Sequence, residues 1–317
     1  MQFTTKIPVQ KSSFPIDYDS KIMLLGSCFA ENMGNKFDYF KFQATTNPFG
    51  IIFNAVSLEK LIRRAVENRM FTENDIFFHN DLWHCFEVHS ELSNPDKDAF
   101  LESLNDLIRL TNQQLNDSTH IIITLGTSWV YRNIESNEIV ANCHKVPQKQ
   151  FKKELLSINQ TEESLQNIVS FIHSVNPNCN FIFTVSPVRH IKDGFVENTL
   201  SKAHLVAAIR KTITNNPSLI TYFPAYEIMM DELRDYRFYA EDMLHPNQTA
   251  IDYIWIQFFE NYISESEFGL MNEICSIQKG LKHRPFNPNT ESHQKFLNQL
   301  DLKIQTIQNQ HPFIKFC

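Results

Sequence analysis

KIMLLGSCFA, residues 21–30, joins a short apolar run to a glycine and a serine. Four consecutive apolar residues are typical of a strand that is buried on both faces of a parallel sheet. Phe29, Met33 and Phe37 then recur at the spacing of one helix face. A strand, a sharp turn and a helix therefore meet at Ser27, where unpaired backbone N–H groups and the helix dipole favour negative charge.

A second informative stretch lies far downstream, at residues 242–245, DMLH. Asp242 and His245 are three residues apart, in a loop-like segment ahead of a helical pattern. A serine hydroxyl is a weak nucleophile unless an imidazole accepts its proton, and a carboxylate fixes the tautomer of that imidazole. With Ser27, the chain holds the three groups of a Ser-His-Asp triad. No Gly-x-Ser-x-Gly elbow surrounds Ser27, which favours a scaffold other than the α/β-hydrolase fold.

Short apolar runs alternate with longer amphipathic segments, which predicts βαβ units and a parallel sheet. The expected core strands are residues 21–26, 40–45, 120–126, 180–185 and 219–223. Helical spacing between them predicts helices on both faces of the sheet. We therefore predict an α/β fold with three layers, α/β/α, around a central parallel five-stranded sheet. Because ligands bind outside the carboxyl ends of such strands, Ser27, Thr127 and Ser186 should converge on one crevice.

Two segments depart from this alternation and predict hairpin insertions. Residues 76–89 should turn at Asn80-Asp81, and residues 129–143 should turn near Ser136-Asn137. Hairpins beside the carboxyl edge would form walls or lids for a substrate. After residue 264 the chain becomes helical and polar. We expect one domain over residues 1–264 and a C-terminal helical extension over residues 265–317, packed on the core, whose last helix has an apolar stripe of Phe296, Leu297, Leu300, Ile304 and Ile307.

Composition and charge restrict the class of protein. The 317 residues are 42% hydrophobic and 12% aromatic, which is ample for a core. A net charge of −7 lacks the basic footprint of a nucleic-acid-binding protein. No long apolar segment precedes residue 21, so we expect neither a signal peptide nor a membrane span, and a cytoplasmic protein. Six cysteines without a Cys-x-x-Cys pair are expected to be reduced thiols.

Glycine is scarce, and its placement is therefore informative. The chain has seven glycines, about a third of ordinary usage. Gly26, Gly50 and Gly126 fall in or beside segments that end apolar runs, where a chain turns sharply or lets a ligand approach the backbone.

Several blocks together resemble a known family. The pentapeptide Gly26-Ser27-Cys28-Phe29-Ala30 resembles the signature of the GSCFA family within the SGNH (GDSL-like) hydrolases, whose nucleophile follows the first strand and whose Asp-x-x-His lies near the end. Further blocks that resemble the family are residues 47–50 (NPFG), 125–131 (LGTSWVY), 142–145 (NCHK), 185–190 (VSPVRH) and 242–246 (DMLHP). The resemblance implies an SGNH/flavodoxin-like fold and serine esterase or acyltransferase chemistry on acylated glycans. Ser27 would be the nucleophile, His245 the base and Asp242 its orienting carboxylate.

The same resemblance suggests where an oxyanion would bind. It places the backbone N–H groups of Ser27 and Gly50 as donors to the developing negative charge. The wider superfamily usually has an asparagine two residues after the glycine of its third block, and this chain has Ser128 there. The third donor therefore stays open among the Ser128 hydroxyl, a backbone group and the Asn47 side chain.

Other residues beside the expected strand ends are candidate substrate contacts. Gly126, Thr127 and Ser128 follow the third strand, and Arg189 and His190 follow the fourth, where they would hold a carboxylate, a sugar hydroxyl or a phosphate. A structural salt bridge is the alternative for the latter pair.

His144, after the second hairpin, has the same two interpretations, and Trp83, Trp129 and Tyr131 either stack on a sugar or pack in the protein. No metal-ligand spacing such as His-Glu-x-x-His occurs, so we expect no metal and no cofactor.

We predict an enzyme that removes or transfers an acetyl or other short acyl group on a small-molecule or oligosaccharide ester. One alternative is a non-catalytic carbohydrate-binding protein on the same scaffold, in which Ser27 only caps a helix. The other is a thiol protein that uses Cys28, since a helix N-terminus can acidify a thiol. The sequence leaves open the acyl group, its acceptor and the oligomeric state.

Overall fold

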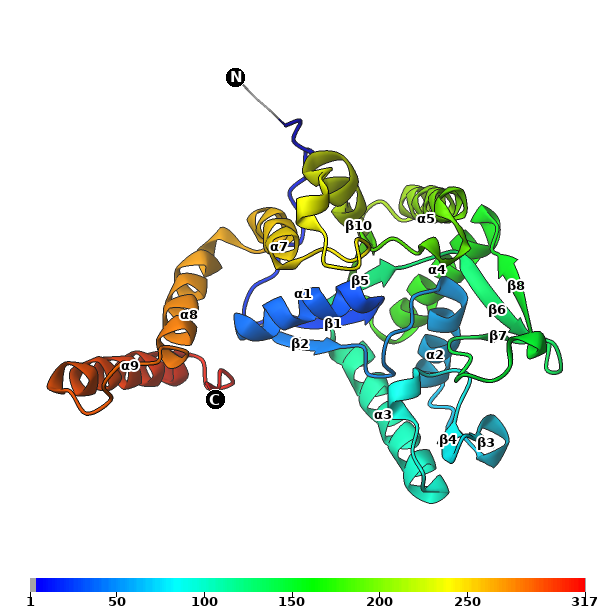
Figure 1. Cartoon of the computed structure of the whole chain (residues 1–317), viewed down its shortest axis with the longest axis horizontal. Coiled ribbons are helices and arrows are strands. Elements are labelled where there is room, and N and C mark those ends of the chain that lie inside the picture. The colour runs from blue at the N-terminus through cyan, green and yellow to red at the C-terminus, as the bar shows by residue number, and fades with distance from the viewer. Residues whose placement is uncertain (1–3, 317) are drawn as a thin grey trace.

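The central sheet of this computed structural model, which describes residues 4–316, has five parallel strands between two layers of helices (Figure 1). The strand order is β10-β9-β5-β1-β2. The strands are β1 (Lys21–Gly26), β2 (Gln43–Thr46), β5 (His120–Leu125), β9 (Asn180–Val185) and β10 (Ile220–Phe223). The predicted three-layer α/β fold is confirmed. This order is the flavodoxin-like one. Successive strands are added on one side of β1 and then, from β5 onward, on its other side. Ligands bind at the carboxyl edge of the sheet beside such a switch point.

Alternate residues of the strands feed two apolar cores, one on each face of the sheet. Ile121 and Ile123 of β5 join the core beneath four helices, whereas Ile122 joins the core on the opposite face. The first face is covered by α2 (Ala55–Val66), α3 (Lys97–Asp117), α4 (Ile158–Val175) and α5 (Phe195–Asn215). The other face is covered by α1 (Cys28–Tyr39) and α7 (Gln248–Tyr262). The central strands β1, β5 and β9 therefore read as nearly continuous apolar runs because both of their faces are buried.

Four of the predicted strand boundaries differ by one to three residues, and one of them is the end of the second strand at Thr46 rather than at residue 45. The second strand begins at Gln43 rather than at residue 40, because Phe40 still caps α1 and Lys41 has a left-handed φ of 62°. The third strand ends at Leu125, and the fifth begins at Ile220.

The first predicted hairpin is confirmed, and the second proves to be part of a larger sheet. β3 (Phe77–His79) and β4 (Leu82–His84) turn at Asn80 and Asp81, whose φ angles of 48° and 62° match a type I′ turn. β6 (Trp129–Asn133) pairs with β7 (Ile139–Val140) and also with β8 (Phe151–Leu155). The prediction of a simple hairpin over residues 129–143 was therefore incomplete, since β8 joins it from outside that segment.

The C-terminal residues form two long helices, α8 (Phe268–Leu281) and α9 (Glu291–Gln310). Figure 1 shows α8 leading away from α7, with α9 at its far end. Ile274, Ile277, Leu300 and Ile307 are buried in the same apolar core as α1 and α7, so the extension packs on that face of the sheet. Phe296, by contrast, is exposed. The division after residue 264 stays a prediction.

Short helical turns connect the longer elements. They are η1 (Glu73–Asp75), η2 (Ser90–Leu92), η3 (Gln148–Gln150), η4 (Ile191–Asp193), α6 (Ala225–Glu227), the π-helical η5 (Ile228–Leu233), η6 (Tyr236–Phe238) and η7 (Glu265–Glu267). No helix within residues 4–316 combines the length and the apolarity that a bilayer crossing requires. Five cysteines are free thiols, and Cys317 lies outside the described residues.

Candidate active site

Ser27 is held at the carboxyl end of β1, beside the switch point of the sheet. Gly26 has a φ of 131°, and a Cβ there would overlap the carbonyl oxygen of Thr124 in the neighbouring strand β5. The Ser27 amide donates to that same oxygen at 3.0 Å, while its hydroxyl accepts from the Phe29 amide at 3.3 Å and so caps α1. Ser27 is 1% exposed. Strand, turn and cap together fix the position of the hydroxyl.

Asp242 and His245 form the pair that the sequence predicts. His245 Nδ1 lies 2.5 Å from Asp242 Oδ2, and the amides of Leu244 and His245 donate to Asp242 Oδ1 at 2.9 and 3.0 Å. These amide bonds, together with the imidazole, lower the pKa of Asp242 to about 2, so the carboxylate stays ionised. With Nδ1 engaged, Nε2 is the ring nitrogen that can exchange a proton with a substrate or a nucleophile.

The loop that carries this pair docks on the carboxyl edge of the sheet. The Arg189 amide, which follows β9, donates to the Leu244 carbonyl at 3.2 Å. Burial, with smaller contributions from the charges of Lys202 and His245, lowers the pKa of the intervening His190 to about 3. Within residues 4–316 no hydrogen bond joins Ser27 to His245. Hydrogen bonds between catalytic groups are often long until a substrate binds.

Lys202 of α5 is a site residue that sequence reasoning missed. Its side chain is 1% exposed, and Nζ donates to the carbonyl oxygens of Gly126 and Ser186, each at 2.7 Å. Gly126 follows β5 and Ser186 follows β9, so one ammonium joins the ends of two strands. Burial lowers the pKa of Lys202 to about 7. The available signal was a lysine on the apolar stripe of a helix, three residues before Leu205.

Most polar groups of the loop after β5 already have partners inside the protein, which weakens the expectation that Gly126, Thr127 and Ser128 contact a substrate. The Gly126 amide donates to the Phe53 carbonyl at 2.8 Å. The Ser128 amide donates to Ser201 Oγ at 2.7 Å, and the Ser128 hydroxyl donates to the Ser201 carbonyl at 3.1 Å. Thr127 Oγ1 lies 2.8 Å from the same Ser201 hydroxyl. Ser128 is therefore not the third oxyanion donor, because α5 uses its polar groups.

Gly50 is a turn glycine, and the expectation that its amide binds an oxyanion is wrong. That amide donates to the Asn47 carbonyl at 2.8 Å. The φ of 74° explains the glycine, and a Cβ would overlap the His89 side chain. Asn47 has a φ of 44° and accepts from the Gly26 amide through Oδ1 at 2.8 Å. It thus supports the turn before Ser27, and its Nδ2 lies 3.5 Å from Glu31 Oε1.

The Ser27 amide, the other expected oxyanion donor, already donates to the Thr124 carbonyl. The next backbone donor along the chain is the amide of Cys28. Cys28 is the first residue of α1, where backbone N–H groups have no partner inside the helix. Within residues 4–316 the Cys28 amide makes no hydrogen bond to another residue. Burial raises the pKa of the Cys28 thiol, and the Glu31 carboxylate raises it further.

Two further candidates have structural partners. The Arg189 guanidinium lies 4.3 Å from the Tyr239 ring and 5.5 Å from the Tyr236 ring, and no salt bridge involves it within residues 4–316. His144 is 3% exposed, and its Nε2 lies 2.7 Å from the Cys85 carbonyl oxygen. Burial lowers the pKa of His144 to about 4, so it is a neutral interior histidine rather than an exposed substrate contact.

The predicted aromatic residues have neighbours of their own. Trp129 Nε1 donates to the Glu197 carbonyl at 3.3 Å, and Lys97 Nζ lies 5.4 Å from the Trp83 ring. Lys153 Nζ lies 5.3 Å from the Tyr131 ring.

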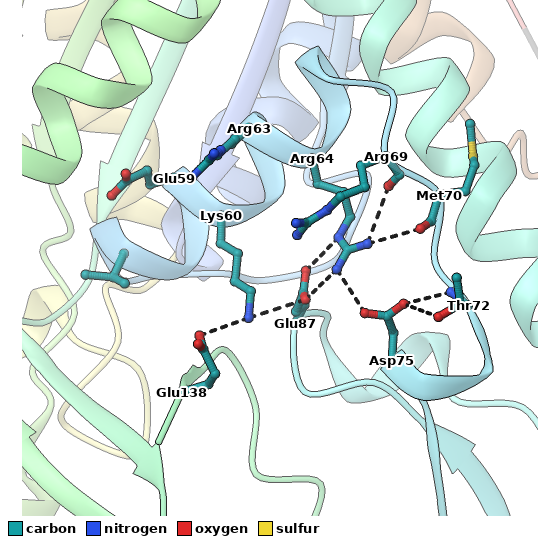
Figure 2. A pocket seen from close by; sticks show the side chains of 11 residues that line it. Glu59, Lys60, Arg63, Arg64, Arg69, Met70, Thr72, Asp75, Glu87 and Glu138 are labelled. Carbon is teal, nitrogen blue, oxygen red and sulfur yellow. Dashed lines mark hydrogen bonds and ion pairs between the residues drawn. The ribbon is translucent and has the colours of Figure 1, made fainter. Parts of the chain in front are cut away.

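A cavity of about 680 Å³ beside α2 is lined by charged side chains (Figure 2). Its centre is the buried Arg64, which donates to both carboxylate oxygens of Glu87 at 2.9 and 2.7 Å and to Asp75 at 3.1 Å. Lys60 bridges Glu87 and Glu138 at 3.4 and 3.3 Å. These ions neutralise one another, so we interpret this Arg64 cavity as an ion-pair network that fixes α2 to residues 75–87.

Comparison with solved structures finds two esterases of low similarity. A family 3 carbohydrate esterase from Clostridium thermocellum is 10% identical, with a TM-score of 0.37, over 80% of this chain and 97% of that one. The acetyl xylan esterase Est2A from the rumen bacterium Butyrivibrio proteoclasticus is 9% identical, with a TM-score of 0.38, over 87% and 66% of the two chains. A comparison with curated proteins gives no match.

Family models match most of the chain. The model of the GSCFA family matches residues 21–258, from the strand before Ser27 to the helix after His245. A second model, described as GSCFA domain protein, C-terminal domain, matches residues 274–316. The first match alone covers well over half of the sequence, and the chain therefore belongs to the GSCFA family.

Proposed function

We propose that this protein is a serine esterase or acyltransferase that removes or transfers a short acyl group, such as acetyl, on a carbohydrate-like substrate. The observation that carries the proposal is the Asp242–His245 pair, whose 2.5 Å contact belongs to a loop docked on the edge of the sheet that bears Ser27. A carboxylate bonded to Nδ1 makes the imidazole a base at Nε2, which is what a serine nucleophile requires.

The proposed reaction has two acyl-transfer steps. Ser27 Oγ attacks the ester carbonyl while His245 Nε2 accepts the hydroxyl proton. The tetrahedral intermediate collapses to an acyl-serine, and His245 returns the proton to the departing alcohol oxygen. Water or an acceptor hydroxyl, deprotonated by the same nitrogen, then attacks the acyl-serine carbonyl, and His245 returns that proton to Ser27 Oγ as the bond between Oγ and the acyl carbon breaks. Asp242 remains ionised throughout and stabilises the transient imidazolium.

We place the oxyanion at the N-terminus of α1. The Cys28 amide is the unengaged backbone donor next to Ser27, and the helix dipole adds positive potential there. The Asn47 amide group is a second candidate donor, because its Nδ2 has only a long contact to Glu31. The positive charge of the buried Lys202 acts on Cys28 and so reaches the same region.

The two rival functions have less support. A Cys28 nucleophile would need to be a thiolate near neutral pH, whereas burial raises the pKa of this thiol. A non-catalytic carbohydrate-binding protein would have no use for a histidine fixed at Nδ1 by an ionised carboxylate. The thiol rival predicts that the Ser27 hydroxyl is dispensable for ester turnover, whereas the binding-protein rival predicts no ester turnover by the native chain.

The test is active-site labelling combined with burst kinetics. A fluorophosphonate should label the native chain, and peptide mapping should place the adduct on Ser27. With p-nitrophenyl acetate the protein should give a burst of p-nitrophenolate, and Ser27→Ala should lower turnover by about 10⁴ or more. Cys28→Ala and the surface variant Ser266→Ala serve as controls. Activity of Ser27→Ala within tenfold of the parent, or an adduct on Cys28, would overturn the assignment.

A further inference from the structure

A cavity of about 330 Å³ lies between the three-stranded sheet and the turn that follows His190. We name it the lysine-flanked pocket. Its walls include the aromatic side chains of Phe53, Tyr131 and Phe151, and its rim carries Lys145 and Lys192. Aromatic faces combined with hydrogen-bonding groups suit a sugar ring, which has an apolar face and a polar edge.

The charge of this pocket is unbalanced. No aspartate or glutamate lines it, and neither lysine takes part in a salt bridge within residues 4–316. The Arg64 cavity differs in this respect, because Lys60 and Arg64 are neutralised there by carboxylates (Figure 2). Two unpaired cations on a chain with a net charge of −7 form a local attraction for an anion.

Both lysines are presented by fixed turns rather than by free loops. Lys145 has a φ of 59° and follows the buried His144, whose ring contacts the Cys85 carbonyl. The Val146 amide closes the same turn on the Cys143 carbonyl at 2.9 Å.

The Lys192 turn is held on both sides. The neighbouring Asp193 is paired with Lys153 of β8, and the His190 amide donates to Asn198 Oδ1 at 2.9 Å. Positions held in this way are pre-organised, which limits the entropy lost when a ligand binds.

The pocket adjoins the carboxyl edge of the main sheet. Phe53 lines the pocket, while its carbonyl accepts from the Gly126 amide and its ring centroid lies 6.0 Å from that of His190. His190 follows Arg189, whose amide donates at 3.2 Å to the carbonyl of Leu244, the residue before His245. We therefore expect a substrate whose ester lies at the triad to extend past Phe53 toward the pocket.

We propose that the lysine-flanked pocket binds an anionic sugar residue, carboxylate- or phosphate-bearing, adjacent to the acylated position of the substrate. The sugar ring packs on the aromatic wall, and the anion lies between Lys145 and Lys192. The role of the pocket as a substrate subsite rests on the proposed esterase function. Binding of the anionic sugar, however, can be measured without turnover.

The binding test uses Ser27→Ala, full chain, titrated calorimetrically with a galacturonate oligosaccharide that carries no acyl group. The double variant Lys145→Gln/Lys192→Gln, in the same background, should lose about tenfold in affinity, and the parent affinity should fall as salt is raised. Lys149→Gln, an exposed lysine of the neighbouring turn outside the pocket, is the matched control and should bind like the parent. Displacement by glucuronate or by glucose 6-phosphate identifies the anion. A neutral xylo-oligosaccharide that binds equally well, or a double variant that matches Lys149→Gln, would overturn the proposal.

An activity arm separates this proposal from the esterase function. On an acetylated galacturonate oligosaccharide, the double variant should raise KM about tenfold with a smaller change in kcat. If the parent turns over no ester while the double lysine variant still binds the oligosaccharide more weakly than Lys149→Gln does, the esterase proposal fails and the pocket proposal stands. If the parent is an active esterase and the lysines change neither KM nor binding, the pocket proposal fails alone.

Discussion

Replacing Lys202 with methionine removes a buried charge while keeping a side chain of similar length. In the parent, Nζ donates to the carbonyls of Gly126 and Ser186 at 2.7 Å. Methionine leaves both buried acceptors without that donor, at about 1–3 kcal/mol each. The same substitution abolishes the cost of burying an ammonium. Burial lowers the pKa of Lys202 from 10.5 to about 7. At a pH where the lysine is charged in both the folded and the unfolded state, this shift lowers the free energy of unfolding by about 5 kcal/mol.

The balance between these two contributions depends on pH, and its sign can be worked out. Below pH 7 both states hold the Lys202 proton, so the burial cost is present in full and stability has no slope from this group. Between pH 7 and 10.5 the unfolded chain binds more protons than the folded chain, so the free energy of unfolding rises with pH. From pH 6 to pH 9 the gain should be about 2.5 kcal/mol. Lys202→Met has no titrating group at this position and should not show this gain in the free energy of unfolding.

Urea unfolding of the parent and of Lys202→Met at pH 6, 7, 8 and 9 measures this difference. The free energy of unfolding of the parent, taken relative to that of Lys202→Met, should change little between pH 6 and 7 and then rise by roughly 2.5 kcal/mol up to pH 9. Lys303→Met, an exposed lysine of α9 without a salt bridge within residues 4–316, should keep a constant offset from the parent. If the curves of the parent and Lys202→Met run parallel, the ammonium is not titrating in the folded state as its burial requires, and the reasoning fails.

Three further substitutions have distinct expected outcomes. Asp242→Asn should lower kcat by about 10⁴ with little change in fold, because the carboxylate that fixes His245 is lost; a kcat within tenfold of the parent would argue against the triad. Gly50→Val should lower the melting temperature, since φ is 74° and the side chain meets His89, and rate should fall only with folded protein; a rate loss at unchanged melting temperature would return Gly50 to the oxyanion site. Arg64→Met should cost about 3–5 kcal/mol in urea unfolding, because it removes the buried guanidinium that pairs with the partly buried carboxylates of Glu87 and Asp75, with unchanged turnover per folded molecule; a loss below about 1 kcal/mol would contradict that role for the Arg64 cavity.

The sequence predicts the parallel sheet well because its strands are local apolar runs. β1 and β9 have the predicted boundaries, and the turn at Asn80-Asp81 follows from residues that tolerate positive φ. β8 was missed because its sequence, FKKEL, is half polar and its partner β6 lies across a long connection. Pairing of that kind depends on tertiary position, which periodicity within a short window does not encode.

The same difference between local and tertiary properties decides which parts of the candidate site could be predicted. Asp242 and His245 are three residues apart, so their pairing is a local property of the turn and could be predicted. The use of each amide and hydroxyl is a tertiary property. Gly50 and Ser128 have residue types that suit an oxyanion site, yet the Asn47 carbonyl and Ser201 occupy their donors. No spacing rule in a single sequence reveals which acceptor a given donor will meet.

These engaged donors give the carboxyl edge its function as a rigid support. Ser201 and Lys202 fasten the ends of β5 and β9, and Asn47 fastens the turn after β1. Electrostatic catalysis requires dipoles that are already oriented when charge develops, and groups bonded within the protein supply that orientation without reorganising. The amide that then faces the oxyanion should be the one with no internal acceptor. For the residues around Ser27 this is Cys28, whose position as the first residue of α1 matters more than its thiol.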